Sequence, residues 1–153
     1  MLARQAAEDA GASEAWFVDA EGFVTEGSAT NAWIVDQDGR LITRPAEFGI
    51  LRGITRSVVV DLAAREGVEI VERPFTVEEA KKAREAFVTS ATKLVTPVVR
   101  VDDSVIGNGK PGSIASNLRA LSSTWRLYTS DAANDTHTRA RSTRATLAVH
   151  CTT

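Results

Sequence analysis

The sequence predicts one domain of the α/β class, of mixed α+β type, in which a mixed β-sheet is flanked by helices. Two observations predict it. Short apolar runs that favour strands alternate along the chain with segments of helical periodicity, and turns containing glycine or proline separate them. The chain has 153 residues, of which 43% are hydrophobic, so it is long and apolar enough to bury the core of one such domain.

The first third of the sequence predicts a helix followed by two pairs of strands. Residues 2–9 are good helix formers, and this helix is expected to end near Gly11. Residues 15–19 and 22–27 predict a strand pair around a short turn. Residues 31–43 alternate apolar and polar side chains about a Gln-Asp-Gly turn, a pattern typical of a β-hairpin.

The middle of the chain predicts three helices and four further strands. The strongest helix spans residues 53–67, because apolar residues recur there at spacings of three and four and Gly67 suits a C-cap. A capping box of Thr76 and Glu79 opens a short helix over residues 76–83. The expected strands are 68–75, 86–91, 94–103 and 104–107, and the last helix is 111–125.

The sequence divides into a domain over residues 1–126 and a tail over residues 127–153. The tail is rich in Thr, Ala, Ser and Arg and has almost no apolar periodicity, so we expect it to be disordered. Its segment LYTSDAAND resembles a one-frame translation of a transposon adapter used in DNA libraries, which would make the tail an artefact. No function is assigned to His137, His150 or Cys151.

Composition excludes several classes of function. The net charge is -2 without a basic block, which argues against nucleic acid or an anionic membrane as a partner. No apolar run suits a membrane span or a signal peptide, and the single cysteine, Cys151, fits a cytoplasmic protein. Residues 1–126 contain no His or Cys, which excludes a Ser-His-Asp triad, a Cys-His pair or a His/Cys zinc site there. Chemistry in this region must use carboxylates, lysines, hydroxyls, backbone amides or a cofactor.

Three element boundaries combine small residues with polar groups. The first, TEGSATN, contains Glu26 and ends at Asn31. The second, ILRGITR at residues 50–56, opens a helix whose first amides lack a partner within the helix, and such amides bind phosphate. The third, TSATK at residues 89–93, ends a strand in a turn that offers amides and hydroxyls. Each also has a plain structural interpretation: a β-turn with a solvated glutamate, a helix entry capped by Thr55, and a strand-end turn.

The order and contents of these stretches resemble the class IV, fold type IV aminotransferases, which use pyridoxal 5′-phosphate. The family pattern has a Glu, two or three small residues, an Asn and an apolar pair. A strand ending in Thr follows, and then an apolar residue, any residue, Gly, an apolar residue, Thr and Arg. The matching positions here are residues 26–33, Leu41, Thr43, Leu51 and residues 53–56, although the family usually has Phe or Tyr where Trp33 stands. The resemblance covers Met1 to about Leu121 and is strongest to bacterial D-amino-acid aminotransferases, less strong to branched-chain aminotransferases.

The resemblance implies the large C-terminal domain of the D-amino-acid aminotransferase-like fold, a mixed sheet or pseudo-barrel flanked by helices. In the family the Glu matching Glu26 pairs with the pyridine nitrogen, and a carboxylate there favours the protonated ring. The residue matching Leu51 packs on the ring. The phosphate is held by residues matching Ile54, Thr55, Ser90 and Ala91. The whole implied cofactor-binding set, which includes no metal ligand, is Glu26, Ser28, Ala29, Thr30, Asn31, Leu51, Gly53, Ile54, Thr55, Ser90, Ala91 and Thr92.

The family's Schiff-base lysine, its catalytic acid and base, has no counterpart in this sequence. It lies in the segment leading into the helix expected at residues 2–9, so by that correspondence it falls a few residues upstream of Met1. The family's N-terminal domain, which helps to build the substrate pocket, is expected to be absent too. The four lysines present, none of which matches that position, are Lys81, Lys82, Lys93 and Lys110. We therefore expect an inactive C-terminal fragment of a protein that is a homodimer at full length.

The resemblance implies that the parent protein moves an amino group between an amino acid and a 2-oxo acid, with D-alanine or D-glutamate as the expected amino acid. Two alternatives within the same fold are an aminodeoxychorismate lyase and a branched-chain aminotransferase. An alternative outside catalysis is a degenerate domain that only binds a phosphorylated ligand or a partner.

Overall fold

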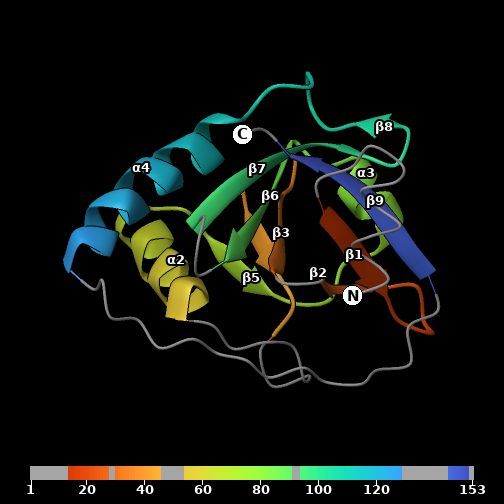
Figure 1. Ribbon diagram of the computed structural model, residues 1–153, viewed down its shortest axis with the longest axis horizontal. Helices are drawn as coiled ribbons and strands as arrows, with labels where there is room; N and C mark the ends of the chain where they lie inside the picture. The colour runs from red at the N-terminus through yellow and green to blue at the C-terminus, as the bar shows by residue number, and fades with distance from the viewer. Residues whose placement is uncertain (1–13, 28–29, 46–53, 91–93, 129–144, 152–153) are drawn as a thin grey trace.

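A curled β-sheet forms the centre of the molecule (Figure 1). The structure, a computed structural model, describes residues 14–27, 30–45, 54–90, 94–128 and 145–151. Within these residues nine strands form one sheet in the order β2-β1-β9-β7-β6-β3-β4-β5, with β8 paired to β7. β4 and β5 run parallel, whereas the other pairs are antiparallel. The mixed α/β class predicted from the sequence is confirmed.

Most of the expected elements are present. The strands are β1 (Glu14–Val18), β2 (Val24–Gly27), β3 (Asn31–Val35), β4 (Leu41–Thr43), β5 (Ile70–Glu72), β6 (Glu85–Ser90), β7 (Leu94–Val101), β8 (Ser104–Val105) and β9 (Ala145–Cys151). The helices are α2 (Ile54–Arg65), α3 (Val77–Lys81) and α4 (Ser113–Tyr128). The capping box of Thr76 and Glu79 opens α3 as predicted. β5 is shorter than the strand expected over residues 68–75, and the helix expected over residues 2–9 lies outside the described residues.

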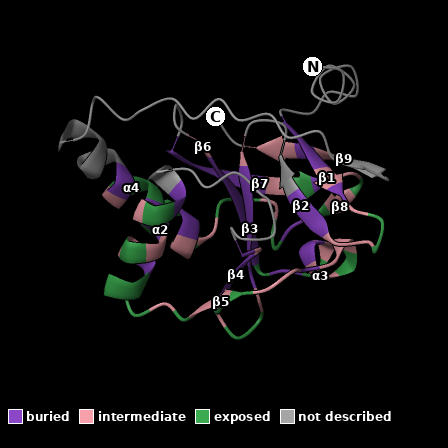
Figure 2. Ribbon diagram, turned by 90° about the horizontal axis from the view of Figure 1, so that it is seen from below, coloured by how far each residue is buried: buried purple, intermediate pink, exposed green. Residues whose placement is uncertain are grey.

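Strand β3 is buried along its whole length and separates two apolar clusters. Trp33 and Val35 belong to a cluster that includes side chains of α2 and α4. Ala32 and Ile34 belong to the other cluster, which includes Ala80 of α3. Figure 2 shows the buried strands at the centre and exposed residues on the outer faces of α2 and α4. Because successive side chains of a strand point to opposite faces, an apolar run such as this one requires cover on both sides of the sheet.

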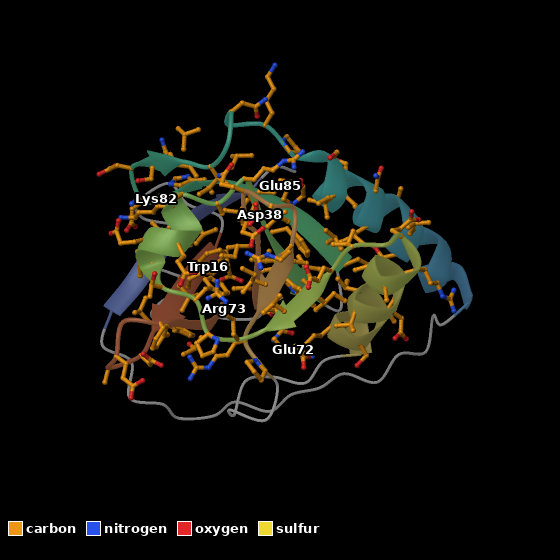
Figure 3. All side chains as sticks on the ribbon, turned by 180° about the vertical axis from the view of Figure 1, so that it is seen from behind. Trp16, Asp38, Glu72, Arg73, Lys82 and Glu85 are labelled. Atoms are coloured by element: carbon orange, nitrogen blue, oxygen red, sulfur yellow. The ribbon has the colours of Figure 1, made fainter. Side chains whose placement is uncertain are left out.

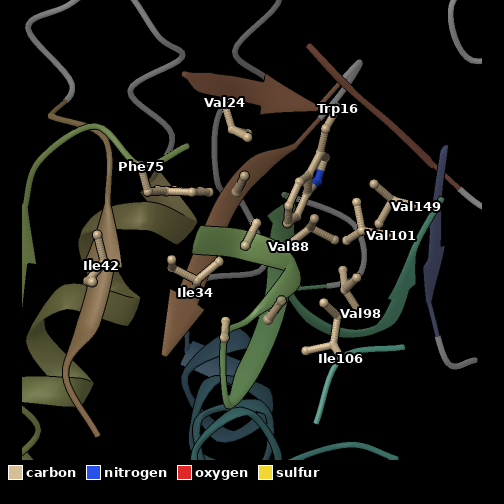
Figure 4. Close-up of a cluster of buried hydrophobic side chains, with 14 of the residues drawn as sticks. Trp16, Val24, Ile34, Ile42, Phe75, Val88, Val98, Val101, Ile106 and Val149 are labelled. Atoms are coloured by element: carbon tan, nitrogen blue, oxygen red, sulfur yellow. The ribbon is translucent and has the colours of Figure 1, made fainter. Parts of the chain in front are cut away.

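Each cluster contains a pair of aromatic rings in contact. Trp33 and Phe87, on the neighbouring strands β3 and β6, stack with ring centroids 5.6 Å apart. Trp16 meets Phe75 edge to face at 6.4 Å in the cluster drawn in Figure 4. Such pairs contribute about 0.5–1.5 kcal/mol each beyond the area that they bury.

A buried carboxylate sets the start of α4. Glu85, at the beginning of β6, is 5% exposed, and its side-chain oxygens accept the backbone N–H groups of Ile114 and Ala115 at 3.3 and 3.0 Å. These amides belong to the first turn of the helix, which has no other intrahelical acceptor for them. A Cβ at Gly112 would overlap the Glu85 side chain, so the close approach requires glycine there.

None of the helices in the described ranges is long and apolar enough to cross a membrane.

Strand β9 differs from the disorder predicted for residues 127–153. The segment Ala145–Cys151 lies between β1 and β7 and pairs with both. Val149 is fully buried, and Cys151, two residues further on, packs against the same apolar cluster. The structure differs from the expectation at this segment, where the Thr- and Ala-rich composition contains a short period-two pattern of Leu147, Val149 and Cys151. Such a pattern can complete two strand edges that would otherwise leave their N–H and C=O groups unpaired.

Asp19 links the turn between β1 and β2 to the residue after β4. Its Oδ1 accepts the backbone N–H groups of Glu21 and Phe23 at 2.9 and 3.0 Å, and its Oδ2 lies 3.1 Å from Nη1 of Arg44. Burial raises the pKa of Asp19, but the backbone hydrogen bonds from Phe23 and Glu21 and the Arg44 guanidinium together lower it more. The net result is a pKa below the ordinary value of 3.8.

We predict that Asp19→Asn destabilises the protein by about 1 kcal/mol near neutral pH, because the ion pair is lost while an amide oxygen can still accept the turn hydrogen bonds. Since the folded pKa is lowered, the carboxylate contributes stability above pH 3.8 and loses that contribution as the pH falls through the lower folded value. Urea unfolding of both proteins over a range of pH measures this, and the free-energy difference should shrink in acid. A difference that is the same at every pH would contradict the assignment. The exposed Glu21, changed to Gln, is the control and should change the unfolding free energy by less than about 0.5 kcal/mol at neutral pH.

Candidate functional site

The turn between β2 and β3 carries the first group of predicted site residues. Glu26 precedes Gly27, the last residue of β2, which pairs with Trp16 of β1. Asn31 begins β3, is buried, and pairs in register with Thr89 of β6. The strands on either side of residues 28–29 are therefore held by β1 and by β6.

The turn between β6 and β7 carries the second group. Ser90 is half-buried at the end of β6 and pairs with Leu94, the first residue of β7. Leu94 is buried and has a φ of 58°, which lies in the left-handed region that a leucine rarely adopts. Backbone strain of this kind persists only where the surrounding structure imposes it, and it is concentrated at binding and catalytic sites.

Helix α2 begins at the same edge of the sheet. Arg56, in its first turn, is buried, and its guanidinium carbon lies 5.7 Å from the centroid of the Trp33 ring. The indole Nε1 of Trp33 donates to the hydroxyl of Thr89 at 2.9 Å, and Thr89 is the neighbour of Ser90. The start of α2 therefore lies close to β3 and β6. The described parts of the three stretches are the end of β2 with the start of β3, the end of β6, and the start of α2, and they belong to neighbouring elements.

The described residues cover only part of the predicted set. Those outside the described residues are Ser28, Ala29, Leu51, Gly53, Ala91 and Thr92. For Glu26, Ile54 and Thr55 the structure describes the strand or helix but not the side chain. The side chains described are those of Thr30, Asn31 and Ser90. The roles of all twelve residues stay predictions, and the fold adds that the elements carrying them are neighbours.

Glu14 is a buried carboxylate beside the first turn that the sequence did not single out. It opens β1 and is 6% exposed. Its Oε1 accepts the backbone N–H of Ala15 at 2.8 Å, and its Oε2 accepts the hydroxyl of Thr30 at 3.1 Å. The signal in the sequence was a charged residue at the start of an apolar strand, which does not distinguish a buried carboxylate from a solvated one. Glu14 therefore anchors Thr30, the residue just before β3.

The residues predicted for this end of the sheet would suit a ligand that carries both a phosphate and a cationic ring. Amides of a first helical turn, which have no partner within the helix, and serine hydroxyls are groups that can bind phosphate oxygens. A carboxylate such as Glu26 favours the protonated form of a ring nitrogen. Across the described ranges, no three His, Cys, Asp or Glu side chains gather closely enough to hold a metal ion. The donor set fits the pyridoxal phosphate that the family resemblance implies.

An open cavity of about 270 Å³ lies elsewhere, between the β3–β4 hairpin and α3. Its apolar lining comes from Ile34, Ile42 and Ala83, and charged side chains of α3 stand at its rim. None of the predicted site residues lines it, so it is separate from the edge where the three turns meet.

Sequence comparison finds relatives over most of the chain. The family model for amino-transferase class IV matches residues 1–101. The branched-chain-amino-acid aminotransferase of Pseudomonas aeruginosa is 42% identical over 119 residues, which cover 78% of this chain and 38% of that protein. The D-alanine aminotransferase of Bacillus licheniformis is 36% identical over 119 residues, which cover 78% of this chain and 41% of that protein.

Structure comparison gives the same fold type. The branched-chain aminotransferase from Thermoproteus uzoniensis with norvaline superposes with a TM-score of 0.77 at 35% identity, over 85% of this chain and 42% of that one. The T.th. branched-chain amino acid aminotransferase with pyridoxamine 5′-phosphate superposes with a TM-score of 0.74 at 38% identity, over 78% of this chain and 39% of that one. The chain spans about two fifths of the length of these relatives.

We predict that Glu14→Ala destabilises the protein by about 1–3 kcal/mol, because the Ala15 amide and the Thr30 hydroxyl lose an acceptor in a buried place. Urea unfolding followed by tryptophan fluorescence measures the change. Glu21→Ala, in the turn of the same β1–β2 hairpin, is the matched control, since Glu21 is exposed and should cost less than about 0.5 kcal/mol. Equal effects of the two substitutions would show that Glu14 does not anchor the turn.

Proposed function

Because the chain belongs to the class IV aminotransferases, we propose that it forms part of the cofactor site of an enzyme that moves an amino group between an amino acid and a 2-oxo acid. The cofactor is pyridoxal 5′-phosphate, as the relative solved with pyridoxamine 5′-phosphate supports. The observation that supports the proposal is that the start of β3, the end of β6 and the start of α2 are neighbours. Asn31 pairs with Thr89, next to Ser90, and Arg56 brings the start of α2 over Trp33 on the same strands.

Each turn has a proposed task. The carboxylate of Glu26 holds the proton on the ring nitrogen, and a protonated ring supplies the electron-withdrawing chemistry for which this cofactor is used. The amides of residues 54–55 and the hydroxyl of Ser90 bind the phosphate. Glu14, through Thr30, keeps the turn that carries Glu26 in place. Leu51 packs against the ring, and the remaining predicted residues line the same site.

The amine that would bond to the cofactor and move the substrate proton comes from outside the described residues. Lys81 is in α3 and Lys82 follows it, and Lys110 lies in the loop before α4. None of the three belongs to β2, β3, β6 or α2, the elements that carry the predicted site, and Lys93 lies outside the described residues. The described part of the chain therefore supplies binding groups for the cofactor, and we propose that it is inactive without that amine.

Relatives of two kinds support two substrate classes. The branched-chain enzyme is 42% identical over 119 residues, and the D-alanine enzyme is 36% identical over the same length. This difference favours a branched-chain amino acid over the D-amino acid expected from the sequence, with the D-amino acid as second candidate. A cytoplasmic homodimer remains our proposal for the full-length protein.

The test of the proposal uses pyridoxamine 5′-phosphate, because its amine cannot form an imine with the lysines present. We predict that the chain binds this compound and raises the pKa of its ring nitrogen by about 1–3 units, and that Glu26→Gln abolishes the rise while affinity changes only a few-fold. Absorbance titration of the bound ring against pH measures the ring pKa, and titration with increasing ligand measures the affinity. Glu21→Gln, on the same hairpin, is the control carboxylate.

Three outcomes would argue for different conclusions. An unshifted ring pKa in the unsubstituted chain would contradict the role of Glu26. Binding of inorganic phosphate without binding of the pyridine compound would favour a degenerate phosphate-binding domain. Once the site is complete, turnover of aminodeoxychorismate in place of amino acids would indicate the lyase.

A further inference from the structure

Arg56 is a buried arginine that joins the first turn of α2 to three strands. It is 6% exposed. Its Nη2 donates to the backbone oxygen of Arg44, just after β4, at 3.1 Å, and lies 3.0 Å from Oε1 of Glu72, the last residue of β5. Its guanidinium also faces the ring of Trp33 on β3. Glu72, labelled in Figure 3, is half-exposed at 51% and marks the end of β5 next to α2.

Burying Arg56 costs free energy that a residue with only a packing role would not require. Burial removes the hydration of the guanidinium, and the ion pair with the half-exposed carboxylate of Glu72 offsets only part of that desolvation free energy. Within the described residues the Nε of Arg56 is buried without a hydrogen-bond partner, which by itself costs about 1–3 kcal/mol. An apolar side chain of similar size would cover Trp33 without these costs. The arginine therefore has a task that needs its direction-specific hydrogen bonds.

The acceptors of Arg56 lie at one end of the sheet. β4 and β5 run parallel, with Thr43 paired to Glu72, so the Arg44 carbonyl and the Glu72 carboxylate stand side by side. The ring of Trp33 is fixed in turn by its hydrogen bond to Thr89. The Arg56 side chain thus connects the start of α2 to β3, β4 and β5 together. The first amides of a helix have no hydrogen-bond partner within the helix, so contacts with other elements help to fix their orientation.

We propose that Arg56 is a positioning residue that holds the amides of residues 54–55, at the start of α2, in place beside the end of β6, so that the site recognises the phosphate of the pyridine cofactor. Arg56 does not contact the cofactor, and it acts through the first turn of α2. This inference rests on the proposed function. It goes beyond that function because it separates two kinds of recognition. Binding of the phosphate depends on Arg56, whereas binding of the ring depends on Glu26 and Asn31.

The experiment compares two fluorescent ligands that differ only in the phosphate, pyridoxamine 5′-phosphate and pyridoxamine. Arg56→Lys keeps the charge but loses the planar guanidinium, which places Nη2 between the Arg44 carbonyl and the Glu72 carboxylate and lies over the Trp33 ring. We expect it to weaken binding of the phosphorylated compound about tenfold or more and binding of pyridoxamine less than about threefold. Arg65→Lys, the same substitution at the exposed last turn of α2, should change neither affinity.

A second variant guards against misfolding of the first. Glu72→Gln weakens one acceptor of Arg56 at a half-exposed residue, and it should produce a smaller loss with the same preference for the phosphorylated compound. Equal losses for both ligands in the folded variants would overturn the inference and leave a general structural role. A parent chain that binds neither ligand would contradict the proposed function itself, and this inference would fall with it.

Discussion

The pairing of β3 with β6 is the constraint on which the rest of the structure depends. Its register places Trp33 opposite Phe87 on the helix-covered face and Asn31 opposite Thr89 at the end of the sheet. A slip of one residue would exchange the faces of β3, so that Trp33 would enter the cluster that Ala32 and Ile34 now fill. It would also shift Asn31 away from Thr89. The same pairing therefore determines both the core and the place where a ligand can bind.

Polar groups are buried at this end of the sheet in a way that the core alone does not require. Glu14 holds the Thr30 hydroxyl, and Arg56 reaches the end of β4. Leu94 adopts a left-handed backbone beside them. The apolar clusters on either side of β3 supply the stability that tolerates these costs. A fold assembled for stability alone would replace such groups by apolar ones, so their concentration at one edge agrees with a binding site there.

Local patterns predicted much of this architecture and missed what depends on distant partners. The hairpins and the capping box of Thr76 were visible because turn and cap chemistry lies within a few residues. Strand β9 was not predicted, because its pairing with β1 and β7 joins segments that are far apart in the sequence. The three turn stretches were found, but sequence alone could not bring them together. Glu14 and the contacts of Arg56 with Arg44 and Glu72 were missed for the same reason.

The central claim is that the start of α2 and the ends of β3 and β6 form one site for a phosphorylated pyridine. Amide chemical shifts recorded while pyridoxamine 5′-phosphate is added to the isotope-labelled chain test it most directly. We expect the amides of Ile54, Thr55, Asn31 and Ser90 to shift together and to saturate at one ligand concentration. Shifts confined to one of these segments, or different saturation points for them, would show that they do not share a ligand and would contradict the account.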